Sequence, residues 1–230
     1  MHSLAELAAP FPSRARATVE NRKVLWREED LAVLQWLLRD VGSAERSRSV
    51  AEDLLDHFGS LPDCLSAPAF KLLEAGLEPS VIHQIQSAWH LVGRVSFGRF
   101  RERNVLNSID DVRQYLRVTM AAQPVEILRV LHLDSRFHLI SDELQQVGTV
   151  GHVPVHLREI AQRALNLGAR GVILVHNHPS GCADPTKEDI ARTNDVRDVL
   201  KPLDIRLIDH LIVGRNQIVS LSEMGLYSAI

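Results

Sequence analysis

Residues 171–189 read GVILVHNHPSGCADPTKED. The aliphatic run at its start is typical of a buried strand, and it leads directly into His176 and His178. Because positions i and i+2 of a strand point to the same side, both imidazoles can reach one point. A carboxylate, Asp189, follows after a Pro-Ser-Gly turn. A catalytic zinc has three protein ligands of these types and a water, so the stretch predicts a hydrolytic zinc site.

The same residues also have structural explanations. Buried polar groups are stable when they are hydrogen-bonded, so the two histidines could be core residues satisfied by backbone atoms. Thr186 and Asp189 match a helix capping box, in which an N-cap hydroxyl and an acid three residues later satisfy the first turn. The two roles of Asp189 are compatible, because a fixed first turn also orients its carboxylate.

The flanking pattern predicts an α/β domain over 105–230. We expect helices over 110–120, 157–165 and 189–200, and strands over 125–133, 137–140, 172–175, 205–208, 211–213 and 218–221. Residues 25–104 have helical periodicity and predict a small helical domain. Residues 1–24 have none, so we expect a flexible leader there.

Composition and charge favour an ordinary globular protein. The 230 residues are 45% hydrophobic and 24% charged, and the formal net charge of −3 provides no general attraction for nucleic acid. Two cysteines, Cys64 and Cys182, do not form a disulfide framework. No apolar run is long enough to span a membrane, and the first residues lack the basic start of a secretory signal. We expect a cytoplasmic protein without a membrane partner; nothing in the sequence indicates its oligomeric state.

The spacing of the histidines and of Asp189 resembles the JAMM (MPN+) metalloprotease signature. His-Asn-His-Pro-Ser-Gly over 176–181 and Ile-Asp-His-Leu-Ile-Val-Gly over 208–214 resemble the RadC-like bacterial branch of that superfamily. The resemblance extends over about residues 123–226. It implies an α/β MPN fold with a mixed β-sheet flanked by helices, and a zinc ion bound by His176, His178 and Asp189.

The resemblance also assigns roles to Glu126 and Thr186. Glu126, at the start of a predicted strand, aligns with the glutamate that acts as acid and base; from its position alone it could equally be a solvated charge. Thr186 stands where the superfamily usually has a serine that stabilises the oxyanion. Threonine keeps the hydroxyl but adds a methyl group and stiffens the side chain. Since loss of an oxyanion donor costs on the order of 10²–10³ in rate, Thr186 bears on how fast the site works.

Two features bear on DNA. The helical part resembles a helix-hairpin-helix-like unit, in which a Gly-x-Gly turn approaches a phosphate. Here residues 76–78 read Gly-Leu-Glu, so the second glycine is missing and the acid repels phosphate. Residues 94–103 interleave arginines with Phe97 and Phe100. These aromatics could stack on bases, or they could dock on a neighbouring element within a solvated linker.

Two further sites are left with alternatives. Cys182 lies in the loop after His178 and could be a fourth ligand, a nucleophile or an incidental loop residue. Asp209 and His210 lie near the end of a predicted strand. They could orient a metal ligand, or they could make structural hydrogen bonds there.

The predicted function is a zinc-dependent metallohydrolase, a metallopeptidase that acts on amide bonds of a peptide or protein through a zinc-activated water. One alternative is a DNA-associated protein, a repair or recombination accessory or a nuclease, with the same metal site and with DNA bound by the helical domain. Another is a scaffold with a structural zinc. No segment resembles the ubiquitin-recognising insertions of JAMM deubiquitinases, so the substrate is not identified by the sequence.

Overall fold

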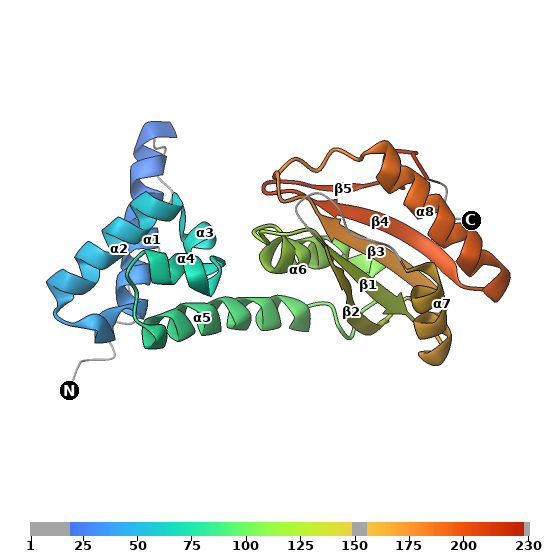
Figure 1. Cartoon of the computed structure of the whole chain (residues 1–230), viewed down its shortest axis with the longest axis horizontal. Helices are drawn as coiled ribbons and strands as arrows, with labels where there is room; N and C mark the ends of the chain where they lie inside the picture. Colours follow the sequence, from blue (N-terminus) through green and yellow to red (C-terminus); the bar gives the residue numbers. More distant parts are fainter. Residues whose placement is uncertain (1–18, 149–155, 228–230) are drawn as a thin grey trace. The chain divides into compact units, whose positions relative to one another are not determined.

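The computed structural model describes residues 19–148 and 156–227 (Figure 1). The chain divides into two compact units, residues 1–64 and 65–230. Helix α1 (Val19–Leu37) begins inside the predicted leader, whose residues 1–18 lie outside the described part. The domain limits expected at 24/25 and 104/105 stay a prediction.

The first unit is helical in its described part. Helices α1 and α2 (Ala44–Phe58) pack against each other across the short 3-10 helix η2 (Arg39–Val41). The Ser43 side chain caps α2 by accepting a hydrogen bond from the backbone N–H of Arg46. Gly59, with φ of 86°, ends this helix in the left-handed region that favours glycine. Helix α3 (Leu61–Leu65) follows.

The second unit begins with helices. These are α4 (Ala69–Glu74), α5 (Pro79–Gly98), the 3-10 helix η3 (Leu106–Ser108) and α6 (Ile109–Met120). Helix α5 packs on α6. Phe97 and Phe100 make edge or tilted ring contacts with Tyr115 of α6, and Phe100 is fully buried. The arginine-aromatic segment therefore docks its aromatics on a neighbouring helix, as the second of its two explanations expects.

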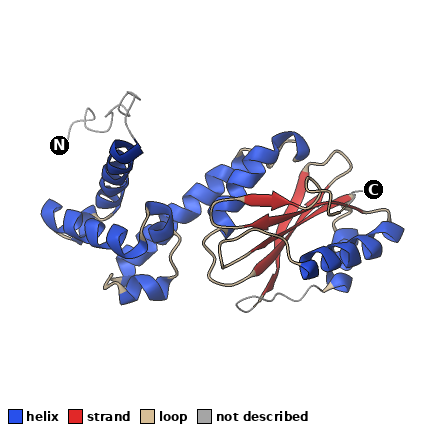
Figure 2. Ribbon diagram, turned by 90° about the horizontal axis from the view of Figure 1, so that it is seen from above, coloured by secondary structure: helices blue, strands red, loops and turns tan. Residues whose placement is uncertain are grey.

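A five-stranded mixed sheet forms the centre of the second unit. Its order is β2-β1-β3-β4-β5, and the pairing is antiparallel except between β3 and β4. The strands are β1 (Ile127–Leu133), β2 (Leu139–Val147), β3 (Gly171–Asn177), β4 (Arg206–Val213) and β5 (Ile218–Ser220). Helices α7 (Leu157–Asn166) and α8 (Lys187–Leu200), followed by η4 (Lys201–Leu203), cover one face, and α6 covers the other (Figures 1 and 2). The predicted α/β fold with a mixed sheet flanked by helices is confirmed.

Strand β3 is buried on both faces, which explains its unbroken apolar run. Val172 and Leu174 join the core beneath α7 and α8, whereas Ile173 and Val175 join the core beneath α6. By this alternation His176 lies on the α7 and α8 face, one strand position before the end. The strand thus delivers its histidine to the face from which α8 brings Asp189.

Strand β4 is continuous, although two separate strands were expected over 205–208 and 211–213. The reason is a β-bulge: Val172 pairs with Leu207, but the next residue, Ile173, pairs with Asp209. The extra residue reverses the alternation along β4, so that Leu207 and Ile212 both face the α8 core. The bulge also brings His210 to that face. Helix α8 begins at Lys187, two residues before its expected start.

No helix within the described ranges is both long and apolar enough to cross a membrane.

Candidate metal centre

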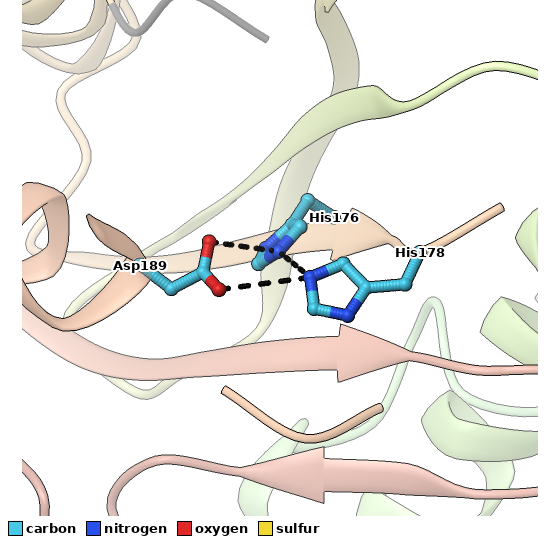
Figure 3. A group of neighbouring side chains, drawn as sticks. All are labelled: His176, His178 and Asp189. Atoms are coloured by element: carbon cyan, nitrogen blue, oxygen red, sulfur yellow. Dashed lines mark hydrogen bonds and ion pairs between the residues drawn. The ribbon is translucent and has the colours of Figure 1, made fainter. Parts of the chain in front are cut away.

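The side chains of His176, His178 and Asp189 converge at the end of β3 (Figure 3). The two Nε2 atoms lie 2.9 Å apart. His176 Nε2 lies 3.1 Å from Asp189 Oδ1, and His178 Nε2 lies 3.6 Å from Oδ2. His176 and Asp189 are buried, while His178 is partly exposed. The structure therefore brings together the three residues that the sequence predicts as ligands.

These spacings fit a zinc ion. Nitrogen and oxygen ligands at 2.0–2.2 Å in a tetrahedron lie about 3.3–3.5 Å from one another, close to the three distances observed. Two imidazoles and one carboxylate also leave one tetrahedral position open, as catalytic zinc sites do. The three residues could hold zinc without a large rearrangement.

The loop after β3 fixes the orientation of His178. Its Nδ1 lies 2.8 Å from the backbone carbonyl oxygen of Cys182. A carbonyl only accepts, so Nδ1 carries a hydrogen in this bond, and Nε2 is the ring nitrogen directed at Asp189. Cys182 takes part through its backbone; its thiol donates to Asp184 and is not in the converging group. The sequence could not predict this contact, because every residue type has a carbonyl.

The carboxylate of Asp189 is held ionised. Burial raises its pKa, but hydrogen bonds from His176, His178 and Thr186 outweigh burial and hold the pKa well below its usual range. The hydrogen bond to Asp189 in turn raises the pKa of His178. An ionised carboxylate beside imidazole nitrogens suits a divalent cation.

Thr186 and Asp189 form the predicted capping box of α8. The backbone N–H and the hydroxyl of Thr186 both donate to Asp189 Oδ2, at 2.8 and 2.6 Å. In return, the backbone N–H of Asp189 donates to the Thr186 hydroxyl at 3.1 Å. The cap occupies Oδ2 and leaves Oδ1 for a cation. The oxyanion role of Thr186 stays a prediction, because the single hydroxyl hydrogen is directed at Asp189.

Glu126, the predicted acid-base residue, lies beside His178, Thr186 and Asp189. It is 7% exposed and lines a pocket of about 470 Å³ together with His178, Thr186 and Asp189. A carboxylate that precedes β1 by one position thus shares a pocket with His178, which directly follows β3. The acid-base role of Glu126 stays a prediction.

Asn177, between the two histidines, holds the segment that carries Glu126. Its side-chain oxygen accepts a hydrogen bond from Ile127 N at 2.8 Å, and its Nδ2 donates to Val125 O at 3.1 Å. Both bonds are to the residues that flank Glu126, and Asn177 is only 1% exposed. Sequence reasoning missed this residue, because its partners are backbone atoms.

Asp209 and His210 have different roles. The Asp209 carboxylate accepts hydrogen bonds from Ser220 Oγ and Ser222 N. These are the structural hydrogen bonds that one of the two explanations expected. His210 Nε2 lies 2.7 Å from His176 Nδ1, a contact that the ligand-orienting alternative requires. Burial lowers the pKa of His210 well below its ordinary range.

Comparison with known proteins bears on this centre. A family model described as "RadC-like JAB domain" matches residues 106–226, which include the sheet, the three converging side chains and Glu126. A UPF0758 protein from Rhodobacter capsulatus is 38% identical over 198 residues, which cover 86% of this chain and 92% of that protein.

Proposed function

Because the chain belongs to the RadC-like JAB family and has the fold of the JAMM metallohydrolase superfamily, we propose that it is a zinc-dependent metallopeptidase that cleaves amide bonds of a peptide or protein. The observation that carries the proposal is the convergence of His176, His178 and Asp189, of which the last two line one pocket with Glu126. Three ligands with a carboxylate close by are the requirements of a hydrolytic site rather than of a closed structural one.

Each residue has a defined task in this proposal. When bound, zinc would supply a Lewis acid that lowers the pKa of a water molecule toward neutrality. Glu126 would accept a proton from the attacking water and return it to the leaving amine. Its burial in the pocket supports this task, because proton transfer needs a group fixed near the reacting atoms. Asp189 would bind through Oδ1 while the Thr186 cap holds Oδ2.

A peptide is favoured over DNA as the substrate. Phe100 is buried against Tyr115, so this ring cannot stack on a base. Glu78 is exposed in the turn before α5, where a phosphate-binding hairpin would need a neutral residue. The pocket, at about 470 Å³, is within the usual range for small ligands or peptide segments.

The test is a cleavage screen with zinc-loaded protein against a peptide library and against single- and double-stranded DNA. We expect peptide cleavage by the wild type and a fall of about 10²–10⁴-fold in the Glu126→Gln variant, with zinc content retained. Glu143→Gln is the matched control, because the Glu143 carboxylate is bound to Arg163 and does not line the pocket.

Full activity in Glu126→Gln would contradict the assigned base. Cleavage of DNA but of no peptide would favour the DNA hypothesis. Zinc binding whose removal unfolds the protein, with no cleavage of any substrate, would favour a structural zinc.

A further inference from the structure

The two imidazoles of the metal centre are held by different kinds of partner. His178 donates to the backbone carbonyl of Cys182, which any residue at that position would supply. His176 Nδ1 instead meets a side chain, Nε2 of His210, at 2.7 Å. The orientation and the hydrogen position of His176 therefore depend on which side chains stand behind it.

His210 is the middle of a buried chain of side chains. Its Nδ1 lies 2.6 Å from the hydroxyl oxygen of Thr193, on α8. That hydroxyl also lies 2.5 Å from the backbone carbonyl oxygen of Asp189, one helical turn earlier. Thr193 is 0% and His210 3% exposed, so water does not compete for these bonds. The chain runs from the backbone of Asp189 to the ring of His176.

At the Thr193 end of this series of hydrogen bonds, the donors and acceptors can be assigned in only one way. The carbonyl of Asp189 can only accept, so the single hydroxyl hydrogen of Thr193 is donated to it. The hydroxyl oxygen is then left as an acceptor, and His210 Nδ1 must donate to it.

At the His176 end, metal binding requires the same assignment of donors and acceptors. A neutral imidazole that offers Nε2 to a metal carries its hydrogen on Nδ1. His176 Nδ1 then donates to His210 Nε2, so the hydrogen of His210 lies on Nδ1, as the Thr193 end demands. No hydrogen is duplicated or missing in any of the three bonds. The arrangement is thus complementary to a cation at His176 Nε2.

We propose that Thr193 and His210 are positioning residues that hold His176 with its hydrogen on Nδ1 and its Nε2 lone pair directed at the metal. The inference rests on the zinc site of the proposed function. The bulge in β4 is required for this arrangement, because it places His210 on the same face of the sheet as His176. Partners that donate or accept behind metal-bound histidines typically affect metal affinity about 10–100-fold.

The test compares Thr193→Val, which keeps the shape and removes the hydroxyl, with Thr193→Ser, which keeps the hydroxyl. The Kd for zinc is measured by competition with a chromophoric chelator. We expect a rise of about 10–100-fold in Thr193→Val and near wild-type affinity in Thr193→Ser. Thr119→Val is the matched control, since the Thr119 hydroxyl also donates to a carbonyl one turn earlier, that of Tyr115 on α6.

A purely structural role would lower the stability of the zinc-free protein and leave the Kd for zinc unchanged. That result in Thr193→Val would overturn the proposal. A second measurement needs no variant: nitrogen-15 NMR of the zinc-loaded wild type should find hydrogens on Nδ1 of both His176 and His210. A hydrogen on Nε2 of His210 would also overturn it. Failure of the wild type to bind zinc is a distinct result, which would remove the proposed function as well.

Discussion

The side-chain oxygen of Asn177 accepts a hydrogen bond from the backbone N–H of Ile127 at 2.8 Å. This bond joins the end of β3 to the start of β1, and the Asn177 amide also holds Val125 O. The histidines on either side of Asn177 point to the metal centre, while Asn177 itself points the other way. The proposed ligands and the proposed base are thereby fixed to one another through a residue that is not in the converging group.

We expect Asn177→Ala to slow peptide cleavage while the Kd for zinc stays close to that of the wild type. The variant leaves a buried N–H and a carbonyl without their partner, which costs about 1–3 kcal/mol of stability and frees the segment around Glu126. Cleavage rates and zinc titrations measure the two effects separately. Asn104→Ala is the control, since the Asn104 side chain also bonds backbone N–H and carbonyl groups but lies outside the site. A full cleavage rate in Asn177→Ala would contradict the positioning role.

Thr186→Val should lower the free energy of unfolding by about 0.5–2 kcal/mol, because it removes the N-cap of α8. It should also weaken zinc binding, since Asp189 Oδ2 loses its hydroxyl partner. Thr186→Ser should behave like the wild type in both measurements. Assays at saturating zinc then isolate the oxyanion role. A rate that recovers indicates a cap alone, and a rate that stays about 10²–10³-fold low indicates an oxyanion donor.

Gly214→Ala should reduce both stability and zinc affinity. A Cβ at this position would lie 2.6 Å from Gly181 O and 3.0 Å from Ala183 N, so the loop that carries Cys182 would have to move. His178 would then lose the carbonyl that orients its ring. Thermal unfolding and zinc titration check the expectation. Gly98→Ala is the control, because a Cβ there meets nothing within 4 Å; equal behaviour of the two variants would argue against the constraint.

His132→Leu should stabilise the protein, and more so at pH 6 than at pH 8. His132 is fully buried, and neither ring nitrogen has a hydrogen-bond partner within the described residues. Burial lowers the pKa of His132 below the ordinary value of 6.5. The unfolded chain therefore binds a proton that the folded chain does not, so wild-type stability falls as the pH drops through about 6.5.

Denaturant unfolding at the two pH values measures this difference. At pH 8 we expect a gain of about 1–3 kcal/mol from removing an unpaired buried group. The exposed His83→Leu should change stability little at either pH. A loss of stability in His132→Leu, or a gain independent of pH, would contradict the explanation.

Much of this centre could be predicted from the sequence because its signal is local. His176 and His178 share a face of the sheet because they are two positions apart at the end of a strand. Asp189 follows in the first turn of a helix, and the sequence also predicts the cap of that helix. The mixed sheet and its flanking helices follow from periodicity and from the family resemblance. Glu126 required that resemblance, because a glutamate just before a strand has no distinguishing pattern of its own.

The supporting contacts could not be predicted in the same way. Asn177 and Cys182 act on or through backbone atoms, which carry no residue-specific signal. The contact between Thr193 and His210 depends on the bulge at Ile208. Without the bulge, strict alternation along β4 would place His210 on the face of the sheet opposite to Leu207 and α8. Register and bulges arise from packing of the whole sheet, which short patterns do not contain.

The proposed function requires that His176, His178 and Asp189 together hold one zinc ion. Metal analysis of purified, zinc-replete protein by mass spectrometry tests it most directly, with His178→Ala as the disrupted variant and His138→Ala, which lies outside the converging group, as the control. We predict one zinc per chain in the wild type and in His138→Ala, and loss of zinc in His178→Ala. A wild type without zinc, or equal zinc content in His178→Ala, would contradict the account.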